Sequence, residues 1–379
     1  MEKQARSSLL FAALILSVCS WSMAALDEPP PSLKPFFSPP TEFKGQLGPY
    51  RSPLIFNDGR VVKTPADWQL RRTEILDFWH KSLGPWPPLL DNPKLQILAS
   101  GPRENFIQHR VTLQSAPTQT LNGYLLIPSG AGPFPAVLVV YYDPETSIGT
   151  NPTHLQRDFA YQLTKRGFVT LSIGSPGGDA RKPELGQAIC QPLSYLAYVA
   201  ANAHTALAHQ PMVDPKRIGV VGHSYGGKWA MFASCLYDKF AAAVWSDPGI
   251  VFDEARGNIN YWEPWYLGFD PNQPPRKRGL ITPQSPRTGP YKTLMESGHD
   301  LHELHALMAP RPFLVSGGAE DTPKRWIALN HTVASNTLLG ARNRVAMTNR
   351  KDHPPTDESN AQLYAFFEHF LSSGTRASP

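Results

Sequence analysis

Short apolar runs alternate along the chain with longer segments in which apolar residues recur every three or four positions. The short runs are typical of buried strands, and the longer segments are typical of amphipathic helices. Strands are predicted at Phe106–Leu113, Thr120–Ile127, Ala136–Tyr141, Gly167–Ile173, Arg217–Val221, Phe240–Trp245, Pro312–Ser316 and Arg344–Thr348. Helices are predicted at Leu155–Leu163, Leu193–Leu207, Lys228–Leu236, Leu301–Met308, Trp326–Leu339 and Leu363–Leu371. This alternation predicts an α/β fold with a mostly parallel sheet and helices on both faces.

The first 24 residues have the organisation of a secretory signal peptide. Lys3 and Arg6 precede an apolar run from Ser8 to Ser20, and small residues end at Ala24, where cleavage is expected. The run is shorter than the roughly 20 residues that span a bilayer, so a permanent anchor is not expected. We therefore expect export to the periplasm or the extracellular space, with no stable membrane span after cleavage.

The mature chain is expected to consist of an N-terminal extension, residues 25–100, packed on a main domain, residues 101–379. The extension begins with a proline-dense stretch to about Pro53, predicted to be extended, and continues with a helix that starts at Thr64. Within the main domain, residues 247–299 interrupt the alternation with prolines, tryptophans and a basic patch. Because long loops in compact domains tend to be functional, this insertion is predicted to cap the site.

Charge and cysteine content narrow the class of protein further. The net charge is +5 over 379 residues, and no basic stripe or zinc-finger spacing accompanies it, so nucleic acid is not an expected partner. Signal cleavage would leave Cys190 and Cys235. In an oxidising compartment these two could form a disulfide, or they could be two buried thiols, and the sequence leaves both open. The oligomeric state is also left open.

The stretch GVVGHSYGGKWA, residues 219–230, places Ser224 between Gly222 and Gly226. In G-x-S-x-G the glycines let a strand turn sharply into a helix, which exposes the serine hydroxyl on a nucleophile elbow. The helix that follows can stabilise an oxyanion with its N-terminus. A glycine-rich turn with an idle serine would give the same pattern, so the rest of the chain has to decide.

A serine nucleophile needs a histidine base and a carboxylate that orients the histidine. In α/β-hydrolases the chain order is serine, acid, histidine. Asp321 and His353 each follow a predicted strand end after Ser224 and fit this order. The oxyanion hole is expected to use the backbone N–H groups of Tyr225 and, within one residue, Tyr142.

Two weaker signals suggest other chemistry. His302, Glu303 and His305 form HELH, which lacks the spacing of H-E-x-x-H, so no metal and no cofactor are predicted. Trp262 and Trp265 in the insertion could bind sugar rings, or they could simply pack the cap onto the domain.

The chain resembles secreted carbohydrate-esterase-type α/β-hydrolases, and is similar to glucuronoyl esterases and bacterial acetyl xylan esterases. The resemblance extends from about Gly59 onward and is carried by GRVVKTPADWQLRRTEIL, DPKRIGVVGHSYGGKWA, FAAAVWSDPG and DLHELHALMAPRPFLVSGGAED. It implies an α/β-hydrolase fold and a sugar contact for Lys228, four residues after the serine. It also implies a rival to Asp321, because the acid of such esterases can lie 23 residues after the serine, where this chain has Asp247.

Two departures separate the chain from glucuronoyl esterases. Tyr225 stands where those enzymes have an arginine after the serine, and no tryptophan stands at Thr322 or Pro323 after the Glu-Asp pair. Uronate recognition is therefore open, as is hydrolysis of acetyl or other small esters.

The sequence predicts a serine carboxylic-ester hydrolase that acts through an acyl-enzyme on esters of plant-type polysaccharides or their fragments. A serine peptidase of the same fold is the enzymatic alternative, and a non-catalytic carbohydrate-binding protein is the alternative from another class. Asp321 is the preferred acid and Asp247 its alternative.

Overall fold

The computed structural model describes residues 28–179, 182–256, 266–270, 272–274, 276 and 279–372. The predicted signal peptide, residues 1–24, lies outside the described residues. No helix in the described part of the chain is long and apolar enough to cross a membrane.

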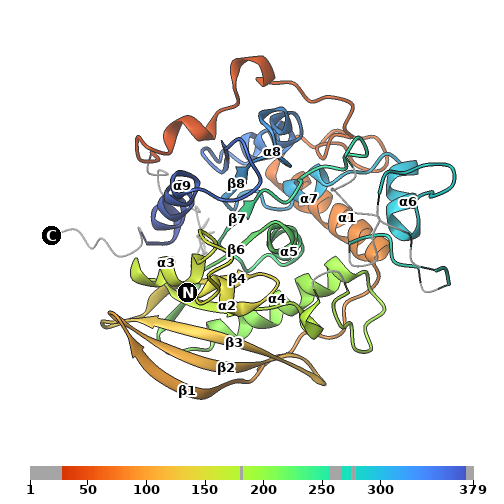
Figure 1. Ribbon diagram of the computed structural model, residues 1–379. Helices are drawn as coiled ribbons and strands as arrows, with labels where there is room; N and C mark the ends of the chain where they lie inside the picture. Colours follow the sequence, from red (N-terminus) through yellow and green to blue (C-terminus); the bar gives the residue numbers. More distant parts are fainter. Residues whose placement is uncertain are drawn as a thin grey trace, which may run out of the picture.

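A nine-stranded sheet runs through the described residues in the order β1-β2-β3-β5-β4-β6-β7-β8-β9 (Figure 1). The strands are β1 (Leu95–Arg103), β2 (Phe106–Ala116), β3 (Gln119–Pro128), β4 (Phe134–Val140), β5 (Val169–Ile173), β6 (Val213–His223), β7 (Ala242–Ser246), β8 (Phe313–Gly317) and β9 (Val345–Asn349). The strands from β5 to β9 in the sheet pair in parallel, whereas β1, β2 and β3 form an antiparallel meander that joins β5. The α/β-hydrolase fold predicted from the sequence is confirmed.

Helices cover both faces of the parallel part of the sheet (Figure 1). The longer ones are α1 (Pro65–Leu83), α4 (Pro192–Ala208), α5 (Tyr225–Leu236), α8 (Trp326–Leu338) and α9 (Asp357–Phe367). Shorter ones are α2 (Pro144–Ser147), α3 (Phe159–Lys165), α6 (Gly289–Glu296) and α7 (His302–Ala306). Two buried clusters result, one shared by α1, α4, α5, α7 and α8 and the other by α3 and α9.

The side chains of the buried strand β4 divide between these two cores. Ala136, Leu138 and Val140 point into the first cluster, and Val137 and Val139 into the second. This division follows from the two-residue period of a strand, and it explains why the strand reads as a continuous apolar run.

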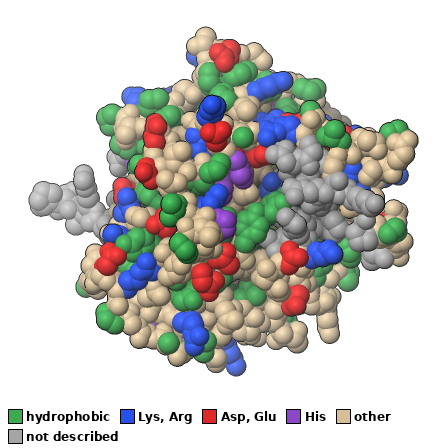
Figure 2. All heavy atoms as spheres, in the orientation of Figure 1, with side chains coloured by type: hydrophobic (Ala, Val, Ile, Leu, Met, Phe, Trp, Pro, Cys, Tyr) green, Lys and Arg blue, Asp and Glu red, His purple; other side chains and the backbone are tan. Residues whose placement is uncertain are grey.

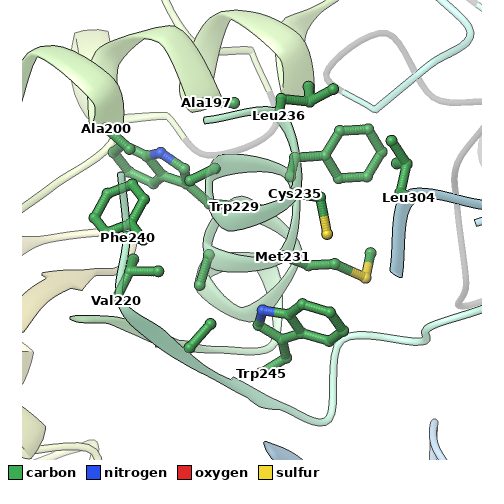
Figure 3. Packing of buried hydrophobic residues seen from close by; sticks show 14 of the residues in the cluster. Ala197, Ala200, Val220, Trp229, Met231, Cys235, Leu236, Phe240, Trp245 and Leu304 are labelled. Carbon is green, nitrogen blue, oxygen red and sulfur yellow. The ribbon is translucent and has the colours of Figure 1, made fainter. Parts of the chain in front are cut away.

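Helix α5, which follows the G-x-S-x-G stretch, lies deep in the first core (Figure 3). Trp229 packs toward Ala200 and Phe240, and Met231 and Cys235 project toward Leu304 of α7 (Figure 3). The indole of Trp229 also donates a hydrogen bond of 2.5 Å to the carbonyl of Leu196 on α4. The core therefore fixes the helix that begins directly after Ser224.

Most predicted elements are confirmed, but one strand was missed and one helix begins later than predicted. Strand β1 was not predicted, because its sequence LQILASGPR contains glycine and proline and five consecutive exposed residues. The helix expected to include Leu155 begins only at Phe159, and Leu155 is 71% exposed in the preceding loop. The spacing of apolar residues there was coincidental, since only Phe159 and Leu163 face the core.

Helix α1, which lies in the predicted extension, begins with a capping box between Thr64 and Asp67 and packs against α6 and α7. The stretch before it contains short 3-10 turns at Lys34–Phe37 and Thr41–Phe43. Strand β1 begins at Leu95, so the sheet starts before the predicted boundary at residue 101. The division into an extension and a main domain with an insertion at 247–299 stays a prediction.

Candidate active site

Ser224 occupies a sharp corner between β6 and α5. Its backbone has φ 59° and ψ −117°, a strained conformation for a residue with a side chain. A Cβ at Gly222 would lie 2.1 Å from the carbonyl oxygen of Gly226, and one at Gly226 would lie 2.2 Å from that of Val140. The two glycines are therefore required by close backbone contacts, as the nucleophile-elbow prediction implies.

Ser224, His353 and Asp247 form a continuous hydrogen-bonded chain. His353 Nε2 lies 2.9 Å from Ser224 Oγ, and His353 Nδ1 lies 2.7 Å from Asp247 Oδ2. The histidine side chain is 34% exposed and the carboxylate is fully buried. This geometry matches a nucleophile, a base and an orienting acid.

The preference for Asp321 as the acid is contradicted by this geometry. Asp247, at the end of β7, contacts the histidine, whereas both oxygens of Asp321 accept backbone N–H groups, from Gly249 at 2.8 Å and Ile250 at 2.7 Å. The alternative that the sequence left open, Asp247, is therefore the carboxylate that contacts His353.

The carboxylates of Asp247 and Asp321 each accept hydrogen bonds from the loop that carries the other. Asp247 Oδ1 accepts N–H groups from Gly318 at 2.6 Å, Glu320 at 3.1 Å and Asp321 at 2.9 Å, all in the loop after β8. Asp321 in turn accepts from the loop after β7. Burial, and then the charge of Asp247, raise the pKa of Asp321, and Arg325 at 3.8 Å opposes this effect.

Two side chains that sequence reasoning missed surround the histidine. Arg350 donates to the carbonyl of His353 at 2.6 Å and to that of Ser316 at 2.8 Å, which fixes the loop after β9. His223 lies with its ring centroid 4.7 Å from that of His353. Burial, followed by the neighbouring His353, holds the pKa of His223 well below its usual range, so it stays neutral. Its place directly before the serine was the only available signal.

Tyr142 follows the carboxyl end of β4, and its phenol is largely buried. Burial raises the pKa of this phenol, so it remains protonated and can donate a hydrogen bond. Its ring centroid lies 5.0 Å from that of Tyr225. The structure thus places both predicted oxyanion residues beside Ser224, and their backbone N–H roles stay a prediction.

Lys228 is buried one helical turn after Ser224. Its ammonium donates to the carbonyl of Pro248 and lies 5.1 Å from the ring centroid of Tyr266 and 5.9 Å from that of Tyr225. The predicted sugar contact of Lys228 stays a prediction. The other two predicted substrate residues, Trp262 and Trp265, lie outside the described residues.

The HELH residues are held by structural contacts. His302 Nε2 contacts the carbonyl of Arg51 at 2.6 Å, and Glu303 lies 2.5 Å from His299 Nδ1. Burial lowers the pKa of His302 to about 4. Among the described residues, no group of three or more His, Cys, Asp or Glu side chains could hold a metal ion.

Cys190 and Cys235 are free and fully buried. Burial raises the pKa of the Cys190 thiol to about 11 and that of Cys235 to about 12. Of the two alternatives that the sequence left open, the structure has two buried thiols.

The face shown in Figure 2 carries histidine side chains near its centre, with a hydrophobic patch beside them. In open α/β sheets, ligands bind at the carboxyl ends of the parallel strands. Tyr142, Ser224, Asp247 and His353 follow the carboxyl ends of β4, β6, β7 and β9. The hydrogen-bonded chain of Ser224, His353 and Asp247 therefore lies at the edge of the sheet where ligands bind in such folds.

Comparisons with known proteins agree with this arrangement. The Prolyl oligopeptidase family matches residues 156–322. A 4-O-methyl-glucuronoyl methylesterase of Neurospora crassa is 29% identical over 52% of this chain and 48% of its own length. A 4-O-methyl-glucuronoyl methylesterase 1 of Wolfiporia cocos is 26% identical over 96% of this chain and 91% of its own length. The chain thus spans about half of the first relative and most of the second.

Solved structures share the architecture. A glucuronoyl esterase from Solibacter usitatus aligns with a TM-score of 0.65 at 17% identity, over 84% of this chain and 97% of its own. A putative acetyl xylan esterase from Bacteroides fragilis aligns with a TM-score of 0.54 at 16% identity, over 82% of each chain. This protein thus has an α/β-hydrolase fold and is similar to glucuronoyl esterases and acetyl xylan esterases.

Proposed function

We propose that this protein is an exported serine carboxylic-ester hydrolase that acts on esters of plant-type polysaccharides, with 4-O-methyl-glucuronoyl esters as the first candidates. The single observation that carries the proposal is the hydrogen-bonded chain Ser224–His353–Asp247 on a nucleophile elbow. Three residues from three separate loops meet at hydrogen-bonding distance, which a structural role for the serine would not require.

In the acylation step, Ser224 Oγ attacks the ester carbonyl carbon while His353 Nε2 accepts the hydroxyl proton. Asp247 holds the proton on Nδ1, so that Nε2 is the free acceptor, and stabilises the imidazolium that forms. The tetrahedral intermediate collapses when His353 gives its proton to the leaving alcohol. The products of this half-reaction are the alcohol and a serine ester of the acid.

In the second half-reaction, water attacks the serine ester and His353 again accepts the proton. Collapse of the second intermediate returns the proton to Ser224 and releases the carboxylic acid. The negative oxygen of both intermediates would be stabilised by the N–H of Tyr225 at the start of α5 and by the phenol of Tyr142.

The substrate class is supported by the relatives and by Lys228. Both fungal relatives carry the name 4-O-methyl-glucuronoyl methylesterase. Lys228 places a cation between Tyr225 and Tyr266 one helical turn from the nucleophile, where it could hydrogen-bond sugar hydroxyls. The signal-like N-terminus supports action on polymers outside the cell.

The proposal is tested by initial rates of purified protein on methyl esters of 4-O-methyl-glucuronate and on acetylated xylo-oligosaccharides. Ser224→Ala should abolish both activities, whereas the matched control Ser100→Ala, on the exposed strand β1, should leave them unchanged. Activity on acetyl esters alone would show that the protein is a deacetylase and not a glucuronoyl esterase. Rates unaffected by Ser224→Ala would refute the hydrolase itself.

One observation favours a second candidate, a serine peptidase, because the Prolyl oligopeptidase family matches residues 156–322. The same rates should therefore be measured on aminoacyl p-nitroanilides. Turnover of these amides above that of the esters would favour the peptidase. A non-catalytic carbohydrate-binding protein is disfavoured, since such a role would not need the intact hydrogen-bonded chain.

A further inference from the structure

A second concave site lies at the same edge of the sheet as Ser224. It has a volume of about 340 Å³ and is formed by the segment after α1, the turn between β2 and β3, and the segment before α4. Strand β3 runs antiparallel to β5, so its first residue, Gln119, lies at the edge of the sheet where β5 ends. In Figure 1 the segment before α4 is the yellow-green loop to the right of α4.

The lining of this pocket carries no charged side chain among the residues described there. The residues include Trp86, Gln119, Leu185, Gln187, Ile189 and Tyr195, together with several prolines. They combine an indole, a phenol and several proline and aliphatic surfaces with the amides of Gln119 and Gln187. Neutral donors and acceptors beside apolar surface suit a ligand with many hydroxyl groups and no charge.

The pocket is preformed by contacts between its three segments. Trp86 Nε1 donates to Ser194 Oγ at 2.8 Å, and Tyr195 donates to Gln119 Oε1 at 2.9 Å. Gln119 Nε2 in turn donates to the carbonyl of Glu184 at 2.9 Å. A ligand would therefore meet side chains that are already oriented, which lowers the entropy cost of binding.

Its rim is apolar and exposed. Ile189 is 79% exposed, the largest exposed fraction among the large hydrophobic side chains of the described residues. Together with the ring of Trp86, it offers apolar surface of the kind that packs against the C–H faces of a pyranose.

Leu185 connects this pocket to a second pocket whose lining includes a segment near Tyr225. That second pocket has a volume of about 290 Å³ and is bordered by Gly268 and Phe269. Tyr266, two residues before Gly268, has its ring centroid 5.7 Å from that of Tyr225, which directly follows Ser224. A polymer lying along this edge could occupy the catalytic site and the uncharged pocket together.

We infer that the uncharged pocket around Trp86, Gln119 and Ile189 is a binding subsite for a neutral stretch of polysaccharide, outside the catalytic centre. The inference rests on the proposed function only for the choice of plant-type oligosaccharides as probes. The subsite would hold the polymer while the esterified sugar reaches Ser224.

Binding is tested directly with ester-free β-1,4-linked xylohexaose, cellohexaose and mannohexaose by titration calorimetry. The rim variant Gln187→Ala/Ile189→Ala alters exposed side chains only, and Trp86→Ala removes the aromatic wall. The matched control Gln69→Ala/Leu70→Ala removes the same chemical groups from the exposed face of α1, where Leu70 is 63% exposed.

We expect at least one hexaose to bind, with the dissociation constant raised about fivefold or more in the rim variant and unchanged in the control. Hydrolysis of small methyl or acetyl esters should be equal in the wild-type protein, the rim variant and the control variant. Hydrolysis of polymeric substrate should fall in the rim variant. If Trp86→Ala does not fold, the rim variant still decides.

Absence of hexaose binding at about 10 mM, or equal binding by the rim variant, would overturn the inference. Binding of a proline-rich peptide in the pocket, together with no binding of any hexaose, would also overturn it. Small-ester hydrolysis is recorded separately, so failure of this subsite and failure of the proposed hydrolase are distinguishable.

Discussion

Replacement of Asp247 by asparagine tests the catalytic assignment most sharply, because the structure dictates how the new side chain must lie. Asp247 Oδ1 accepts three backbone N–H groups, from residues 318, 320 and 321. An asparagine must therefore place its oxygen at this position and its NH₂ group at the position of Oδ2, facing His353.

In that orientation the amide donates to His353 Nδ1, which can then no longer carry the proton. The imidazole is forced into the tautomer protonated on Nε2, and Nε2 cannot accept the proton of Ser224. Loss of the correct tautomer in a serine triad lowers kcat about 10⁴-fold, or about 5 kcal/mol of transition-state stabilisation. We expect this loss in kcat for Asp247→Asn, with little change in KM.

The matched variant is Asp321→Asn, which makes the same chemical change one loop away. Both of its oxygens accept N–H groups, so one N–H would face an NH₂ group, at a cost of about 1–3 kcal/mol in the free energy of unfolding. We expect kcat to fall by about tenfold or less, since the triad itself is intact.

Both variants are assayed by steady-state hydrolysis of a small ester, with circular dichroism to verify folding. Equal losses of kcat in Asp247→Asn and Asp321→Asn, or a larger loss in the second, would refute the assignment of Asp247. Retention of more than about a tenth of wild-type kcat by Asp247→Asn would refute the tautomer argument.

Three further predictions follow from buried polar groups. Tyr142→Phe should lower kcat by about 10- to 100-fold with KM nearly unchanged, because an oxyanion donor is lost. The control Tyr141→Phe, in the same loop, should have little effect, and a fall of kcat in both variants would point to a structural role. Burial raises the pKa of Asp300 to about 7, so its contribution to stability is present near pH 4 and is lost as pH rises toward 7. Asp300→Asn should therefore flatten the pH dependence of the free energy of unfolding between about pH 4 and 7 in urea titrations, and an unchanged slope would contradict this. Cys190 and Cys235 should react with a thiol reagent only after unfolding, as read by mass spectrometry of the labelled peptides; labelling of the native protein would contradict their burial.

The order of strands and helices was predictable because buried strands and helices require characteristic patterns of apolar residues. Strands buried on both faces, such as β4 and β8, read as apolar runs, and α4 and α8 carry helical spacing over three or more turns. The antiparallel strand β1 lacked such a signal, since its residues are mostly exposed and its contribution is backbone pairing with β2. Packing against a neighbour far along the chain is not visible in a local pattern.

Ser224 and His353, which the structure brings to hydrogen-bonding distance, could be identified from the sequence because each depends on a local feature. Ser224 needs two glycines within its own turn, and His353 directly follows the last strand of the sheet. The pocket around Trp86 had no such signal, because its three segments are separated by up to about a hundred residues. Only the folded chain brings them together.

The sequence offered both Asp321 and Asp247 but could not decide which carboxylate contacts His353, and the reason is backbone conformation. Asp247 and Asp321 follow the neighbouring parallel strands β7 and β8, so both loops reach the same edge of the sheet. Asp247 adopts φ 50°, a left-handed conformation that is uncommon for a residue with a side chain, and its carboxylate meets His353 from there. Its three bonds to the loop of Asp321, and the two bonds that Asp321 returns, hold this conformation in place. The carboxylate that loses the contact with His353 is therefore part of what keeps the other one in position, and a pattern of residue types contains neither the sign of φ nor the direction of these bonds.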